Sequence, residues 1–126
     1  MYAVVTGASR GIGKAIARIF ALHGYDLLLT SQNEDKLLQT VAEFKKDFPD
    51  ISIDAQAMDI GIKEKAVLFA GWAAGKADTI DVLVNNAGIA KDNAFPAIPW
   101  EDWDAVTRTT LDGFYNVTRA LVMPMP

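Results

Sequence analysis

The 126 residues are 51% hydrophobic and 22% charged with a net charge of −4, which predicts one folded domain with a sizeable core. The acidic balance argues against a nucleic-acid surface, and the absence of cysteine excludes disulfides and thiolate metal sites. No apolar run approaches the ~20 residues of a membrane span, and no signal peptide precedes the first apolar run. We therefore expect a cytoplasmic protein that binds no metal, no nucleic acid and no membrane.

Short apolar runs alternate with segments of helical periodicity along the chain. Strands are predicted at Ala3–Val5, Asp26–Thr30, Ile51–Met58 and Val82–Asn85. Helices are predicted at Ile12–His23, Glu34–Phe48, Lys63–Ala77 and about Glu101–Val122, with a long irregular connection at Lys91–Pro99. Such alternation is typical of an α/β fold, in which right-handed crossovers join parallel strands.

The first strand leads into a glycine-rich segment, VVTGASRGIG, at residues 4–13. Glycine lets the backbone turn tightly and lets a phosphate approach bare N–H groups, while a helix start adds unpaired donors and a positive dipole end. Three glycines in seven residues are also compatible with a tight strand-to-helix turn that binds nothing. The spacing Gly-x-x-x-Gly-x-Gly differs from the common dinucleotide fingerprint.

A second motif, Asn85-Asn86-Ala87-Gly88, follows the fourth predicted strand and alone would be an ordinary polar turn. The two motifs in this order resemble the short-chain dehydrogenase/reductase family, and most of all its β-ketoacyl-thioester reductases. Three further stretches extend the resemblance over essentially the whole chain: Asp59-Ile60, Trp103–Val106 and Leu111–Asn116. The resemblance implies a Rossmann-type fold, here its N-terminal half, with strand order 3-2-1-4.

The resemblance also implies which residues bind the nicotinamide dinucleotide. Asp59 and Ile60 would contact the adenine, although Asp59 could equally be an acid at a helix start. The adenosine ribose would lie beside Asn86, Ala87 and Gly88. The turn that contains Gly7, Gly11 and Gly13, called the glycine turn below, would hold the pyrophosphate. The full expected set is Gly7, Ala8, Ser9, Arg10, Gly11, Ile12, Gly13, Ser31, Gln32, Asp59, Ile60, Asn86, Ala87 and Gly88.

Cofactor choice depends on the residues at the end of the second strand, Thr30-Ser31-Gln32-Asn33. A carboxylate there would bind the ribose 2′-hydroxyl of NAD, and this stretch contains none. Arg10 offers a guanidinium suited to the extra phosphate of NADP, although it could also be a solvated surface residue. The resemblance therefore implies NADP, while Gln32 stands where many NADP-dependent relatives carry a second arginine.

The family's catalytic Ser, Tyr and Lys are not found in these 126 residues. Tyr115 is followed four residues later by Arg119, but it lies within the last predicted helix, where an aromatic packs. Thr110 stands at the position of the family's catalytic Asn. The resemblance thus implies a dinucleotide-binding portion, residues 1–126, that stops before the catalytic segment. A truncated gene product, part of a longer protein and a designed half-fold all remain open.

Two functions follow from this reading. The chain is either the NADP-binding part of an oxidoreductase that reduces a carbonyl, or an inactive half-fold that serves as a structural or interaction module. An unpaired edge on Val82–Val84 and apolar residues on the last helix predict that the chain associates with itself as a dimer or larger species.

Overall fold

The computed structural model describes residues 1–88, 93–123 and 125–126. Four parallel strands form one sheet in the order β3-β2-β1-β4, as predicted. The strands are β1 (Tyr2–Thr6), β2 (Asp26–Ser31), β3 (Ile53–Ala57) and β4 (Val82–Val84). The predicted connection at 91–99 lies partly outside the described residues; its described part contains a 3-10 turn, Phe95–Ala97.

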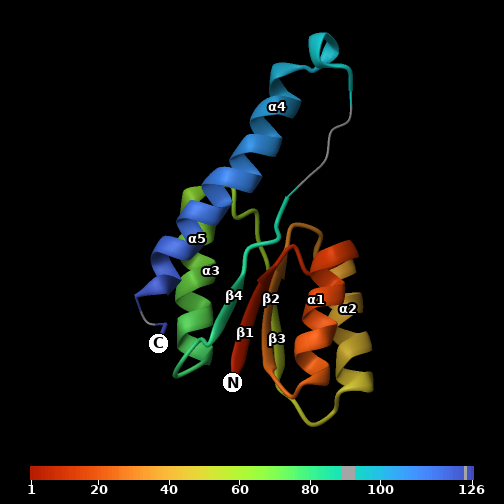
Figure 1. Cartoon of the computed structure of the whole chain (residues 1–126), viewed down its shortest axis with the longest axis vertical. Coiled ribbons are helices and arrows are strands. Elements are labelled where there is room, and N and C mark those ends of the chain that lie inside the picture. The colour runs from red at the N-terminus through yellow and green to blue at the C-terminus, as the bar shows by residue number, and fades with distance from the viewer. Residues whose placement is uncertain (89–92, 124) are drawn as a thin grey trace.

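Helices cover both faces of the sheet (Figure 1). On one face lie α1 (Gly11–Leu22) and α2 (Glu34–Asp47); on the other lie α3 (Lys63–Lys76) and α5 (Gly113–Val122). Alternate residues of β1 and β2 point to opposite faces, so that Val4 and Leu28 join one core and Leu27 and Leu29 the other. Both central strands are buried, which explains their continuous apolar runs.

The last predicted helix differs from expectation in its middle. It comprises α4 (Trp100–Thr107), a π-helical segment at Arg108–Asp112, and α5. The wider turn coincides with a close approach to the loop before α3, because a Cβ on Gly61 would lie 3.3 Å from the Thr109 Cα. A Cβ on Gly113 would likewise lie 3.1 Å from Ile60. Such π segments occur often at functional sites.

The carboxyl ends of all four strands meet at one edge of the sheet, beyond which α4 projects (Figure 1). The glycine turn joins β1 to α1 at this edge, and the second motif follows β4 there. Because β1 and β4 are hydrogen-bonded neighbours, the fold brings two motifs together that are separated by about 80 residues. Ligands of open α/β sheets bind at this edge, where the strand order reverses.

Candidate functional site: a cleft at the carboxyl edge of the sheet

A cleft of about 420 Å³ opens at the carboxyl ends of β1, β2 and β4. Its walls come from the glycine turn, from the residues after β2, from the residues after β3 and from the second motif. The lining residues are Gly7, Ser9, Arg10, Gly11, Ile12, Thr30, Ser31, Gln32, Asn33, Lys36, Met58, Ile60, Asn86, Ala87, Gly88 and Thr109.

The backbone of the glycine turn adopts conformations that would be strained for residues other than glycine. Gly7 and Gly11 adopt φ angles of +64° and +58°, in the left-handed region that favours glycine. A Cβ on Gly7 would lie 2.9 Å from the Ala87 Cα, so the turn and the second motif are in direct contact. A Cβ on Gly11 would meet nothing within 4 Å, so the turn is open to the cleft at that point.

Gly13 is required for close packing within the site. A Cβ there would overlap the Gly7 carbonyl oxygen and the Asn86 side-chain nitrogen. The atoms next to Gly13 therefore belong to the turn and to the second motif. Asn86 Nδ2 donates a 3.2 Å hydrogen bond to that same carbonyl of Gly7.

The start of α1 leaves N–H groups available for an anion. Arg10 is the N-cap residue, and its side chain makes no capping hydrogen bond in the described structure. The first N–H groups of a helix have no partner within the helix, and they carry the positive end of its dipole. With Gly11 open on the cleft side, this end of α1 can therefore hold a phosphate group.

Thr6 connects the two motifs from below the cleft. Its hydroxyl is fully buried and accepts hydrogen bonds from the backbone N–H groups of Asn86 (3.0 Å) and Ala87 (2.9 Å). It donates in turn to the Val84 carbonyl at 3.4 Å. One side chain at the end of β1 thus fixes the backbone path that follows β4.

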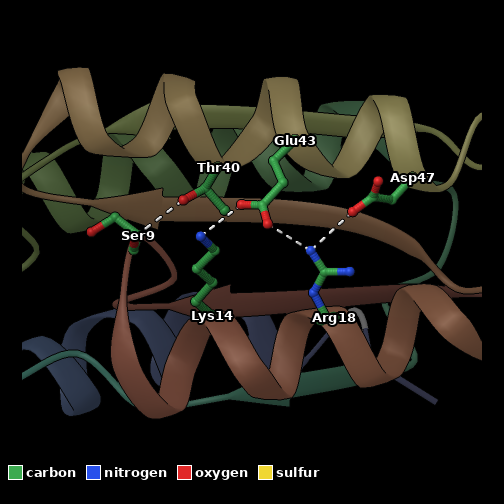
Figure 2. A network of polar contacts seen from close by, with 6 residues as sticks. All are labelled: Ser9, Lys14, Arg18, Thr40, Glu43 and Asp47. Carbon is green, nitrogen blue, oxygen red and sulfur yellow. Dashed lines mark hydrogen bonds and ion pairs between the residues drawn. The ribbon is translucent and has the colours of Figure 1, made fainter.

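Hydroxyl groups also hold the opposite wall. Ser9 and Ser31 share a 2.7 Å hydrogen bond between their side chains, which joins the glycine turn to the end of β2. Thr40 of α2 donates to the Ser9 carbonyl at 3.1 Å, and Figure 2 shows this contact beside the ion pairs between α1 and α2. In these pairs Lys14 and Arg18 meet Glu43 at 2.7 and 2.8 Å, and Arg18 also meets Asp47 at 3.0 Å.

Eleven of the predicted site residues line the cleft, and three do not. Ala8 is fully buried, and Gly13 lies beneath the turn. Asp59 is half-buried, and its Oδ1 accepts a 3.0 Å hydrogen bond from the Gly61 N–H in the turn before α3. The contact observed for Asp59 is therefore the local one that a residue near a helix start makes. Its neighbour Ile60 does line the cleft.

Five further residues, which were not predicted from the sequence, also line the cleft. They are Thr30, Asn33, Lys36, Met58 and Thr109. Asn33 caps α2 by accepting from the Lys36 N–H at 3.0 Å, a role that its place before Glu34 could have indicated. Thr109 is buried in the π-helical segment, and its Oγ1 has no hydrogen-bond partner in the described structure. No sequence pattern pointed to Thr109.

Thr110 lies beside the cleft rather than in it. Thr110 lines a smaller cavity of about 200 Å³ together with Thr6, Asn85 and Phe114. Ile60 and Ala87 line both cavities, so the two spaces are adjacent. Thr110 is exposed, and its side chain carries a hydroxyl group.

A family model of the short chain dehydrogenases matches residues 1–126. The chain belongs to the short-chain dehydrogenase family. It is 41% identical over 130 residues to a 3-oxoacyl-(acyl-carrier-protein) reductase of Aggregatibacter actinomycetemcomitans, with 97% of this chain and 50% of that protein covered. It is 38% identical over 127 residues to nodulation protein G of a Rhizobium species, with 98% and 48% covered.

Solved structures of dehydrogenases share the fold. An alcohol dehydrogenase from Thermococcus sibiricus, complexed with 5-hydroxy-NADP, aligns with a TM-score of 0.90 at 28% identity, covering 98% of this chain and 52% of that chain. L-sorbose reductase from Gluconobacter frateurii, complexed with NADPH and L-sorbose, aligns with a TM-score of 0.89 at 28% identity, covering 98% and 47%. This short-chain dehydrogenase chain spans about half the length of the curated relatives it matches.

The described residues contain neither a membrane-spanning helix nor a cluster of metal ligands. None of the helices there is both long and apolar enough to cross a membrane. Within residues 1–88, 93–123 and 125–126 no group of three or more His, Asp or Glu side chains could hold a metal ion. Phosphate recognition is the chemistry that the glycine turn and the helix start supply to the cleft at the carboxyl edge.

Proposed function

We propose that residues 1–126 are the dinucleotide-binding portion of an oxidoreductase that reduces a carbonyl by hydride transfer from NADPH. The observation that carries this proposal is the cleft wall in which Gly7 and Gly11 have positive φ angles beside an uncapped helix start. A phosphate can approach N–H groups there without meeting a side chain. The dinucleotide, when bound, would supply the hydride; the chain's own residues hold and orient it.

Binding of NADPH to the folded chain tests the proposal, and two glycines make a matched pair of variants. Gly11 and Gly24 both have positive φ angles, of +58° and +82°, and a Cβ on either would meet nothing within 4 Å. Alanine at either position should therefore cost a similar backbone strain, about 1–2 kcal/mol. Only Gly11 lines the cleft, so only Gly11→Ala should weaken NADPH binding in calorimetry.

Failure of the folded chain to bind NADPH at millimolar concentration would contradict the proposal. Equal losses of affinity in Gly11→Ala and Gly24→Ala would mean that the loss comes from general destabilisation. Circular dichroism and thermal melts of each variant establish that the samples compared are folded.

NADP rather than NAD is the cofactor that we propose, on the basis of Arg10. Arg10 is exposed, lines the cleft and is in no ion pair in the described part of the chain. A charge-assisted contact to the 2′-phosphate would contribute on the order of 1–3 kcal/mol. Arg10→Ala should therefore weaken NADPH binding far more than NADH binding. Equal losses for the two cofactors would show that Arg10 does not recognise the phosphate.

For the substrate we propose a β-ketoacyl thioester, which the 41% identity to a 3-oxoacyl-(acyl-carrier-protein) reductase supports. The 126-residue chain has no tyrosine followed by lysine four residues later, because Thr6, Leu29 and Arg119 stand at those positions. It lacks the proton donor that the family uses, so we expect no turnover of an acetoacetyl thioester with NADPH.

Measurable turnover of the thioester by the 126-residue chain would contradict this expectation, provided that Gly11→Asp abolishes the turnover. The intact mass of the purified natural protein adds a separate observation. A mass well above 13.7 kDa would show that a further segment accompanies this one.

An interaction module is the second candidate function, and exposed apolar side chains support it. Trp103, Leu111 and Phe114 are 48%, 62% and 51% exposed along α4, the π-helical segment and α5. In the described part of the chain no strand pairs with the outer edge of β4. Exposed apolar area and open strand edges both favour association. We therefore propose that the isolated chain pairs with a second copy of itself.

A further inference from the structure

We infer that Lys36 is the second cation that reads the 2′-phosphate of the dinucleotide, in a subsite shared with Arg10. This inference rests on the proposed function, and it adds a specificity-determining residue to the cleft. The last residue of β2 is Ser31 and the residue directly after the strand is Gln32, so neither position supplies a positive charge. Lys36 lines the same cleft from the first turn of α2.

The register of α2 places Lys36 toward the glycine turn. Thr40, Glu43 and Asp47 form one stripe of this helix, and Figure 2 shows all three pointing toward α1 and the glycine turn. Side chains three and four residues apart share one helix face. Lys36 precedes Thr40 by four residues and so continues the stripe by one turn, toward the end of the helix that borders the cleft.

Contacts on both sides hold this end of α2 close to Arg10. Thr40 donates to the carbonyl of Ser9, the residue before Arg10, at 3.1 Å. The Ser9 side chain is in turn bonded to that of Ser31 at 2.7 Å. Lys36 stands one helical turn from the first of these contacts, and Asn33 accepts from its backbone N–H at 3.0 Å. Arg10 and Lys36 therefore line one wall region that includes the end of β2.

The charges of this region favour an anion. Neither Arg10 nor Lys36 is in an ion pair in the part of the chain that the structure describes. Glu34 and Asp35 also lie in the first turn of α2, but they are exposed and do not line the cleft. A phosphate dianion between two unneutralised cations would meet the hydroxyl of Ser31 as well, a donor set that fits a phosphate monoester on a ribose.

A lysine at this place would act differently from an arginine directly after the strand. Its ammonium group is a point charge on a flexible stem, so it neutralises the phosphate without the fixed fork geometry of a guanidinium. We therefore expect that Lys36→Arg retains the preference for NADPH and that Lys36→Gln reduces it. Lys46→Gln, near the other end of the same helix, makes the same change of net charge away from the cleft.

The decisive experiment is calorimetric titration of the 126-residue chain and these variants with NADPH, NADH, adenosine 2′,5′-diphosphate and adenosine 5′-monophosphate. We expect Lys36→Gln to weaken NADPH and the 2′,5′-diphosphate by about tenfold and to leave NADH and the 5′-monophosphate unchanged. The affinity of NADPH should also become less sensitive to salt in Lys36→Gln. Lys46→Gln should change none of these affinities.

The outcomes separate this inference from the proposed function. Unchanged NADPH affinity in Lys36→Gln, in a chain that binds NADPH, would overturn the role of Lys36 and leave the proposed function intact. Equal losses for all four ligands would show that Lys36 supports the fold of the cleft, and this too would overturn the inference. A folded wild-type chain that binds neither dinucleotide would overturn the proposed function, and the role of Lys36 with it.

Discussion

Single hydroxyl groups determine much of the geometry of the cleft, and Thr6 is the clearest case. It accepts from two backbone N–H groups that belong to a segment 80 residues away. Valine has nearly the same shape and no acceptor, so Thr6→Val would leave both N–H groups without a partner. An unpaired buried donor costs about 1–3 kcal/mol.

We therefore predict that Thr6→Val lowers the free energy of unfolding by about 2 kcal/mol or more, as measured by urea denaturation. Thr6→Ser keeps the hydroxyl and removes one methyl group, so its loss should be smaller, about 1 kcal/mol. A serine variant less stable than the valine variant would mean that packing of the methyl group, rather than the hydrogen bonds, is the main contribution of Thr6.

Between elements, ion pairs link α1 to α2, the helix that carries Lys36 (Figure 2). The hydrogen bond from Lys14 is the main cause that lowers the pKa of the Glu43 carboxyl. Burial opposes this effect, and the charges of Lys14 and Arg18 lower the pKa further. A carboxyl whose pKa is lower in the folded state stabilises the fold at neutral pH. That stabilisation is lost as the pH falls through the lowered pKa.

We predict that Glu43→Gln destabilises the chain most at neutral pH. The difference in unfolding free energy from the wild type should shrink as the pH falls through the lowered pKa, and also as salt is raised. Urea denaturation over a pH series measures it. Glu64→Gln on α3 is the control, since Glu64 is in no ion pair in the described structure. A difference that grows toward acid pH would contradict the assigned role of Glu43.

For the whole molecule, we predict a dimer or a larger species in sedimentation at micromolar concentration. Phe114 is 51% exposed on α5, whereas Val117 and Leu121 of the same helix are buried against the core. The helix therefore has apolar side chains on more than its inner face, and water-exposed apolar area favours association. A monomer of 13.7 kDa would contradict the prediction.

Phe114→Glu should shift the association equilibrium toward the monomer, because the contact would then bury a charge. Leu38 is an exposed apolar residue of α2, 55% accessible, on the opposite side of the sheet. Leu38→Glu introduces the same charge there, and it should leave the association unchanged. If both variants dissociate equally, net charge rather than the face of α5 governs assembly.

The alternation of strands and helices and the parallel sheet could be predicted from the sequence, because buried strands appear as short apolar runs and helices show a helical period. The strand order came from the resemblance that the two motifs carry, and it is observed. Helix α2 was predicted at Glu34–Phe48 and ends one residue earlier, since Pro49 prevents its continuation. The glycine turn and the second motif could likewise be predicted from the sequence, because both depend on local backbone chemistry.

The tertiary structure alone decided what surrounds those motifs. In the sequence, Lys36 is one of several charged residues in a predicted helix, and nothing there distinguishes it. Only the packing of α2 on the glycine turn brings Lys36 to the cleft. The π-helical segment coincides with the close approach of Thr109 to Gly61, a contact between segments 48 residues apart. Local patterns specify backbone conformation. A cleft is formed by side chains from segments that are far apart in the sequence, and no local pattern specifies which of these segments meet in space.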